Sequence, residues 1–360
     1  MSGLLTIRDG IPRFAARVRA GVPATIVAYG TSMTLLGHYL AQLPAALEAA
    51  APGAPVRLIN RGLRGFVTFA GAFRVATDVV PHVPDLVLLE FAHNEATPDA
   101  IDNIPPALDG IIAQVRAVNP DCDFAFVLLA PRGVAAAGPS AAMRVHEEIA
   151  GFYRFPTFDL ATLAERLVAS GRAPWMGEGG LTTDGIHHSE RAAQLIGGPF
   201  AEAFSELLRA SGHPPAAPRP VLDHSLVRMT RTPVAAHRTS GDWATGIPPN
   251  HDTRNCEAYD DVVAEPLEVG ATFRVGFAGT RVFLWAMGTG AIESMIVGSG
   301  VRNRVEIASG PEWSFHTISP TLPSAPYELE VVALELPLVL GDLFIIGRLL
   351  GGTGPPDMVK

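Results

Sequence analysis

Short apolar runs alternate with longer stretches of helical periodicity between residues 24 and 210. Four of the runs are rich in branched and aromatic apolar residues, at 24–29, 56–60, 85–91 and 124–130. Such content is typical of parallel strands, which are buried on both faces. Amphipathic segments lie between and after them, at 33–50, 68–80, 103–118, 140–151, 161–169 and 190–210. One strand-helix unit after another predicts an α/β domain built on a largely parallel sheet.

The pattern changes after the stretch SGHPPAAPRP at 211–220, which holds four prolines in ten residues. Beyond it, short β-rich segments are separated by Gly, Pro or Asn, at 273–277, 281–286, 292–297, 304–307, 327–336 and 342–349. Short strands with turn signals between them predict an antiparallel sandwich or jelly roll. We therefore divide the chain into an α/β domain at 1–211, a linker at 212–222 and an all-β domain at 223–360.

Composition and charge argue against nucleic-acid and membrane partners. The 360 residues are 48% hydrophobic, and 27 Lys and Arg stand against 36 Asp and Glu, for a net charge of -9. Without a basic patch, we expect no nucleic-acid partner. No apolar stretch reaches the ~20 residues of a membrane-spanning helix, and the charged first segment lacks the apolar centre of a signal peptide. We expect a cytoplasmic protein without a membrane partner.

The first apolar run ends in Gly30-Thr31-Ser32, and a helical pattern follows at once. Ser32 is therefore expected at a strand-to-helix turn above the carboxyl edge of the sheet. There, N–H groups at a helix N-terminus point toward a bound ligand. Taken alone, Ser32 is more simply explained as a helix N-cap. A nucleophilic serine needs partners elsewhere in the chain.

The segment Thr183–His188, with the sequence TDGIHH, offers such partners just before the last helical stretch. A carboxylate three residues before a histidine can lie beside its ring, fix its tautomer and stabilise the imidazolium that forms during catalysis. Taken alone, the segment also fits a surface loop in which Asp184 caps a helix. The adjacent pair leaves the base open between His187 and His188. We discount a metal site because adjacent side chains diverge and no further ligand has metal spacing.

Two further loops follow strands at the same predicted edge, where open α/β sheets bind their ligands. The loop NRGLRGF begins at Asn60, and its glycines allow backbone conformations that direct an N–H into the cleft. The loop EFAHNE begins at Glu90 and places the Asn94 amide where it can donate to a developing oxyanion. Either loop alone would more often be an ordinary turn.

Together these motifs resemble the blocks of the SGNH (GDSL-type) hydrolases, a family of serine esterases. Gly30-Thr31-Ser32 resembles the G-D-S block, with Thr31 where Asp is usual. Asn60-x-Gly62-x-x-Gly65 resembles the second block, in which the later glycine usually supplies an oxyanion N–H. The resemblance therefore gives that role to Gly65.

The third and fourth blocks follow in the family's order. Ala92-His93-Asn94-Glu95 resembles G-x-N-D, in which Asn94 matches and Ala92 and Glu95 depart. Asp184-x-x-His187 matches the last block and assigns the base to His187, with His188 where Pro is frequent. An α/β-hydrolase is the weaker alternative, because it would require G-x-S-x-G and a triad Asp well separated from the His.

The resemblance implies a three-layer α/β/α, flavodoxin-like domain and ester hydrolysis through an acyl-enzyme. Ser32 would be the nucleophile, and His187 the base and then the acid, oriented by Asp184. The N–H groups of Ser32 and Gly65 and the side chain of Asn94 would form the oxyanion hole. No metal and no organic cofactor would be required.

The segment at 279–288 is similar to β-sandwich domains attached to carbohydrate-acting members of this family. That similarity favours the O-acetyl ester of a sugar or oligosaccharide as substrate. Trp175 would stack on a sugar ring, Arg64 would recognise an anionic group and His93 would line the pocket. A solvated Arg64, a Trp175 that covers a core edge and a His93 packed under its loop are the alternatives.

Two other functions remain open from the sequence. One is a general short-chain esterase, thioesterase or lysophospholipase that uses the same residues. The other is a catalytically silent carbohydrate-binding protein. The number of subunits is also open, and a homo-oligomer is compatible with the sequence.

Overall fold

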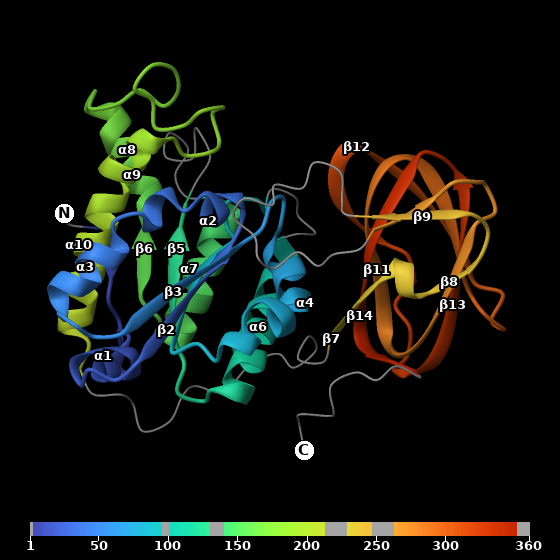
Figure 1. The fold of residues 1–360 in the computed structure, drawn as a ribbon, viewed down its shortest axis with the longest axis horizontal. Coiled ribbons are helices and arrows are strands. Elements are labelled where there is room, and N and C mark those ends of the chain that lie inside the picture. The colour runs from blue at the N-terminus through green and yellow to red at the C-terminus, as the bar shows by residue number, and fades with distance from the viewer. Residues whose placement is uncertain (1–2, 96–100, 130–139, 213–228, 247–262, 351–360) are drawn as a thin grey trace. The chain divides into compact units, whose positions relative to one another are not determined.

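The computed structural model describes residues 3–95, 101–129, 140–212, 229–246 and 263–350 (Figure 1). The chain forms two compact units, Met1–His224 and Ser225–Lys360. Residues 213–222 of the predicted linker lie outside the described residues. The exact domain boundary therefore stays a prediction.

A six-stranded sheet forms the centre of the first unit, in the order β1-β6-β5-β4-β2-β3. Its strands are β1 (Leu5–Thr6), β2 (Ala24–Gly30), β3 (Val56–Gly62), β4 (Leu86–Glu90), β5 (Asp123–Leu128) and β6 (Thr157–Asp159). Neighbours from β3 to β6 pair in parallel, and β1 is antiparallel to β6. The four predicted strands and the largely parallel sheet are confirmed. The strands β1 and β6 were not predicted, because two or three residues are too few to form a periodic pattern.

Helices connect these strands and cover both faces of the sheet. They are α1 (Pro12–Arg19), α2 (Ser32–Leu36), η1 (His38–Leu40), α3 (Leu43–Ala50), α4 (Thr68–Asp78), η2 (Val80–His82), α6 (Ile104–Val118), α7 (Ala141–Tyr153), α8 (Leu160–Ala169), α9 (Glu190–Leu195) and α10 (Gly197–Ala210). Helices α3 and α10 lie on one side of the sheet, and α4 and α6 on the other (Figure 1). The first unit is therefore a three-layer α/β/α domain, as predicted.

Two helices predicted as continuous are divided. The stretch 33–50 is interrupted at Gly37, which ends α2 in the left-handed conformation with φ of 69°. The stretch 190–210 is interrupted at Ile196, before Gly197-Gly198-Pro199. A proline in the first turn of a helix loses no hydrogen bond, so α10 begins here as a separate helix.

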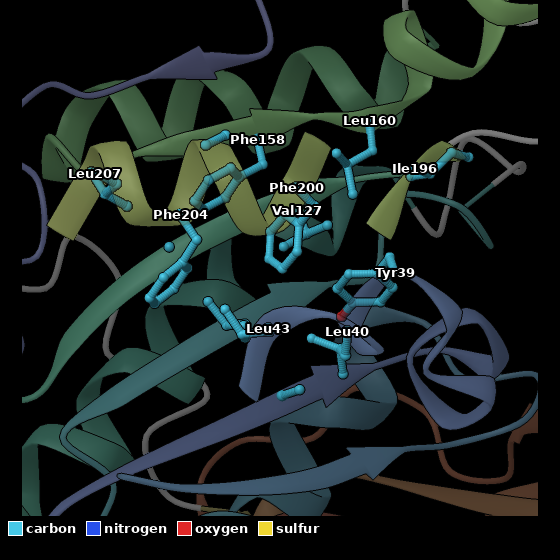
Figure 2. Close-up of a cluster of buried hydrophobic side chains, with 14 of the residues drawn as sticks. Tyr39, Leu40, Leu43, Val127, Phe158, Leu160, Ile196, Phe200, Phe204 and Leu207 are labelled. Carbon is cyan, nitrogen blue, oxygen red and sulfur yellow. The ribbon is translucent and has the colours of Figure 1, made fainter. Parts of the chain in front are cut away.

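A cluster of buried side chains holds α3, α8, η1 and α10 against one face of the sheet (Figure 2). The ring of Phe200 packs edge-on against Phe158 at 4.8 Å and against Tyr39 at 5.4 Å. Leu43 and Phe204 extend the same cluster. Tyr39 follows α2 closely along the chain, so this core also fixes the segment that leaves the end of β2.

The strand order creates a switch point at the carboxyl ends of β2 and β4. From β2 the chain crosses to β3 on one side, and it then returns to β4 on the other side of β2. Open α/β sheets bind ligands where the order reverses in this way. Ser32 follows β2, and Asn94 follows β4. The topology therefore brings two of the predicted site residues to one edge of the sheet.

The second unit is all-β, as predicted, and its eight described strands form one antiparallel sheet. They are β7 (Met229–Pro233), β8 (Arg238–Ser240), β9 (Trp243–Gly246), β10 (Val263–Pro266), β11 (Thr272–Ile296), β12 (Arg302–Thr317), β13 (Ala325–Glu335) and β14 (Leu338–Leu349), with a short helix η3 (Val234–Ala236). Strand β13 pairs with both ends of β11, so the sheet curls around its own core.

The separate strands predicted at 273–277, 281–286 and 292–297 are wrong as separate elements, because they belong to the single strand β11. Its pairing register shifts next to Gly279 and Gly288. At these bulges the glycines bend the strand and do not end it. In the described residues no helix is long and apolar enough to cross a membrane.

Candidate active site

Ser32 occupies the first position of α2, directly above the end of β2. Thr31 is the N-cap, and its side-chain oxygen accepts a hydrogen bond from the Met33 N–H at 3.2 Å. The helix lies directly on the neighbouring strand, since a Cβ atom at Gly62 would lie 2.0 Å from the Leu35 nitrogen. Only glycine at that position lets α2 approach so closely. The capping that the sequence suggested for Ser32 is therefore done by Thr31.

A hydrogen-bonded relay links Ser32 to the loop before α9. The Oγ of Ser32 lies 2.9 Å from Nε2 of His187, and Nδ1 of His187 lies 2.6 Å from Oδ2 of Asp184. When Nδ1 carries a proton and donates it to Asp184, Nε2 is free to accept the serine proton. The structure thus brings together three residues from opposite ends of the domain in the order that nucleophilic catalysis requires.

The carboxylate of Asp184 is held by its own turn. Its Oδ1 accepts hydrogen bonds from the backbone N–H groups of Ile186 at 2.9 Å and His187 at 2.7 Å. Slight burial opposes ionisation, but these bonds and the one from the His187 ring lower the pKa of Asp184 to about 2. Asp184 therefore stays ionised at neutral pH and faces a fixed side of the imidazole.

Trp175 supports this turn. Its indole N–H donates to the Gly185 carbonyl at 2.9 Å, and its ring packs against the core cluster of Figure 2. The Trp175 carbonyl accepts from the backbone N–H of Thr182 at 2.9 Å, which fixes the chain just before Asp184. The indole predicted to stack on a sugar is thus also a support for the relay.

The three predicted oxyanion donors lie on the loops that follow β2, β3 and β4. As the first residue of α2, Ser32 has an N–H that no carbonyl within its helix accepts. Gly65 is exposed and adopts φ of 68°, in the left-handed region. The amide of Asn94 donates one hydrogen to the Phe66 carbonyl at 2.8 Å, which leaves its second hydrogen for a ligand.

No protein-family model matches the sequence, and no curated protein matches it either. Solved structures do match. A two-domain esterase active on acetylated mannans aligns with a TM-score of 0.73 and 17% identity, over 94% of this chain and 98% of that one. The same kind of esterase crystallised with mannopentaose aligns with a TM-score of 0.71 and 17% identity, over 94% and 97%. The chain therefore shares the fold of this two-domain esterase, with an α/β/α domain followed by an all-β domain.

One departure from the usual SGNH motif is explained by a buried network that the sequence did not reveal. Oε1 of Glu95 accepts from the Thr68 N–H at 2.9 Å, at the start of α4, and Oε2 lies 2.8 Å from Nε2 of His146. The side chains of Glu95 and His146 are 1% exposed. This network joins the Asn94 loop to the residues just after Gly65. The only signal in the sequence was the replacement of the usual Asp by a longer acid at position 95.

Two buried histidines lie near His187 in this candidate site. His93 and His188 each have a buried Nδ1 that finds no partner among the described residues. Burial, and then the neighbouring imidazoles, lower the pKa of His93 to about 4 and of His188 to about 3. Both rings are therefore neutral at pH 7. Of the two adjacent histidines, His187 contacts Ser32, and His188 is buried.

Two exposed apolar side chains lie at the turn that carries Asp184 and His187. Ile186 is within that turn, and the Met176 sulfur would lie 3.8 Å from a Cβ atom at Gly185. Arg64 is also exposed, next to Gly65. Across the described ranges, no group of three or more His, Cys, Asp or Glu side chains is arranged to hold a metal ion.

Proposed function

We propose that this protein is a serine esterase that removes O-acetyl groups from a carbohydrate through an acyl-enzyme. The observation that carries the proposal is the unbroken relay from Ser32 Oγ through His187 to Asp184, at 2.9 and 2.6 Å. It stands at the topological switch point, where an α/β sheet binds its ligand. A nucleophile, a base and an orienting carboxylate in hydrogen-bond contact are the parts that acyl transfer needs.

The proposed reaction has two halves. His187 Nε2 takes the proton as Ser32 Oγ attacks the ester carbonyl, and the carbonyl oxygen becomes an oxyanion. The N–H groups of Ser32 and Gly65 and the free amide hydrogen of Asn94 stabilise that charge. The intermediate then expels the sugar oxygen, which takes the proton from His187 and leaves as a hydroxyl group. Water attacks acetyl-Ser32 as His187 takes its proton, and the second intermediate then breaks its bond to Ser32. His187 returns the proton to Ser32 Oγ, and acetate leaves.

Carbohydrate is the proposed alcohol because the likeness to the mannan esterase extends over both domains. That neighbour acts on acetylated mannans, and 98% of its length is covered here. A lone α/β unit would not have favoured a sugar over any other alcohol. Acetylated manno-oligosaccharides are therefore the first natural substrate to test, with the small molecule p-nitrophenyl acetate as a general probe.

A short-chain esterase, thioesterase or lysophospholipase is the second candidate. The exposed apolar side chains of Met176 and Ile186 at the Asp184 turn favour it, because they give a longer acyl chain or a lipid tail a surface to contact. Rates on p-nitrophenyl esters from acetate to octanoate separate the two. Activity concentrated on acetate supports the carbohydrate esterase, and a rise toward octanoate supports the second candidate.

Asn94→Ala should lower kcat for p-nitrophenyl acetate by about 10²-fold, because one oxyanion donor is lost. KM should change much less, since the amide acts mainly on the charge that develops in the transition state. Steady-state kinetics on the purified variant measure both. An equal rise in KM with unchanged kcat would contradict the oxyanion role and assign Asn94 to ground-state binding.

His93 is proposed to bind a hydroxyl group of the sugar. Its Nδ1 is buried without a partner, so Nε2 is the nitrogen left for a ligand. Unpaired buried N–H groups are rarer than unpaired acceptors, which places the proton of the neutral ring on Nε2 and makes it a donor. Within the described residues no protein group contacts this side chain through a hydrogen bond.

His93→Phe should therefore reduce kcat/KM for the acetylated oligosaccharide about tenfold, the loss of roughly one hydrogen bond. The same variant should stay within about twofold of wild type on p-nitrophenyl acetate, which has no hydroxyl groups to bind. His93→Gln, which keeps a donor, should recover part of the loss. An equal loss on both substrates would show that His93 acts on the relay and not on the sugar.

A further inference from the structure

Glu90 ends β4 and is fully buried against the turn that carries Ser32. Its Oε2 accepts three hydrogen bonds, from the Thr31 N–H at 3.1 Å, the Thr31 hydroxyl at 2.8 Å and the Thr34 hydroxyl at 3.0 Å. The Glu90 carbonyl also accepts from the Thr31 N–H at 3.0 Å. One side chain therefore holds the residues on both sides of Ser32.

The residue type at position 31 indicates what the contact between Glu90 and Thr31 does. Thr31 stands where SGNH hydrolases usually have Asp, so this chain has no carboxylate next to the nucleophile in sequence. Gly30 and Glu90 pair in register between β2 and β4, which brings the Glu90 carboxylate to Thr31 from the neighbouring strand. We propose that Glu90 is a positioning residue that holds the 31–34 turn, and with it Ser32, and supplies the carboxylate that position 31 lacks.

The surroundings of Glu90 are polar but carry no positive charge. The groups that face it are the hydroxyl and backbone N–H groups of Thr31 and Thr34, and the Tyr39 hydroxyl lies 3.0 Å from Thr34 Oγ1. In the described part of the chain Glu90 pairs with no cation, and its Oε1 has no partner. A buried acid without a cation lowers stability, and such groups cluster where a side chain serves the chemistry of a site.

This burial makes the contribution of Glu90 to stability depend on pH. Burial raises the pKa of Glu90 to about 7, against the opposing effect of its hydrogen bonds from Thr31 and Thr34. Because the folded state holds the proton more tightly, the contribution of Glu90 to stability is complete below about pH 4.5 and is lost as the pH rises through 7. In Glu90→Gln this part of the pH dependence of unfolding should be absent.

The test compares wild type with Glu90→Gln, Thr31→Asp and the double variant Thr31→Asp/Glu90→Gln. Each is assayed for kcat and KM on p-nitrophenyl acetate, for thermal unfolding, and for the rate at which a fluorophosphonate labels Ser32. In labelling, Ser32 Oγ forms a bond to phosphorus, fluoride leaves and His187 takes the proton. Labelling needs Ser32 and His187 but no ester substrate, so it reports on Glu90 even where the proposed esterase function, on which the kinetic readout rests, fails.

Asp123→Asn is the matched control. Asp123 is also buried, accepts two backbone N–H groups, from Arg13 and Phe14, and has a pKa that burial raises to about 7. It begins β5, at the amino edge of the sheet opposite Ser32. This variant should change the pH dependence of unfolding but leave kcat and labelling within about twofold of wild type.

Glu90→Gln should lower kcat and the labelling rate at least about tenfold with little change in KM. Thr31→Asp should also lower both, because two acids then share one buried site. In the double variant, kcat and the labelling rate should be about tenfold higher than in the less active of the two single variants. The buried site then again holds one carboxylate, beside a neutral amide. The proposal is overturned if Glu90→Gln loses only thermal stability, if the two substitutions combine without rescue, or if wild type neither hydrolyses the ester nor reacts with the fluorophosphonate.

Discussion

Replacing Ser32 by Ala should lower kcat for p-nitrophenyl acetate by about 10⁴-fold or more. Among the described residues, the Ser32 side chain forms a hydrogen bond to His187 Nε2 alone, so the variant removes the nucleophile and little else. The N-cap formed by Thr31 and the hydrogen bond from the Thr31 hydroxyl to Glu90 remain in place. Residual hydrolysis should come from the oxyanion donors and binding alone, as it does when a triad is disabled.

Two control measurements accompany the kinetics of Ser32→Ala. Thermal unfolding of Ser32→Ala should match wild type, since alanine suits the first turn of a helix. After incubation with substrate, the wild-type peptide that contains Ser32 should carry an acetyl group in a rapid-quench sample, and the variant peptide should not. If Ser32→Ala retained a tenth of the wild-type rate, the serine mechanism would be wrong.

Asp184→Asn should lower kcat about 10³-fold while the fold stays intact. The amide oxygen can still accept the backbone N–H groups of Ile186 and His187, so the turn is preserved. The amide NH₂ would then face Nδ1 of His187 and favour the tautomer whose Nε2 carries the proton, which cannot accept from Ser32. We expect a smaller loss than for a fully buried triad acid, because the Asp184 side chain is 52% exposed and water can partly replace it.

Steady-state kinetics and thermal unfolding of the same preparation measure this effect. Asp121→Asn is a suitable control, since Asp121 is also exposed but pairs with Arg13 next to the amino end of β5. Its kcat should equal that of wild type. A kcat for Asp184→Asn within threefold of wild type would mean that His187 does not need Asp184 and that the relay is not the catalytic unit.

The relay could be predicted because its parts are local in sequence. Asp184 and His187 are three residues apart, so one turn places the carboxylate beside the ring. Ser32 comes directly after an apolar strand, and strand ends meet at one edge of a parallel sheet. Which histidine is the base could not be derived from the residues alone. Only the resemblance to a family motif distinguished His187 from His188.

The supports of the relay could not be predicted, because they join residues far apart in the chain. Glu90 reaches Thr31 across 59 positions, and Glu95 reaches His146 across 51. A single sequence carries no periodic signal for such pairs. Trp175 was singled out for its ring, but the partner of its indole N–H is a backbone carbonyl, which no sequence pattern marks.

The boundaries of an element were predicted well where a continuous apolar run defines it. They were predicted poorly where pairing with other strands determines how far a strand extends. The buried strand β4 matches its apolar run to within a residue at each end. Strand β11 does not, because its glycines were interpreted as turns, although pairing with β12, β13 and β14 carries the strand through them. Glycine allows both outcomes, and only the partner strands select between them.

Acetate release from acetylated manno-oligosaccharides tests the central claim most directly. The full chain is incubated with the oligosaccharide, and Ser32→Ala serves as the blank, beside parallel assays on p-nitrophenyl acetate and octanoate. The proposed function predicts that wild type releases acetate, that the blank does not, and that acetate esters are cleaved faster than octanoate. No release of acetate from the oligosaccharide, together with faster cleavage of octanoate, would contradict it.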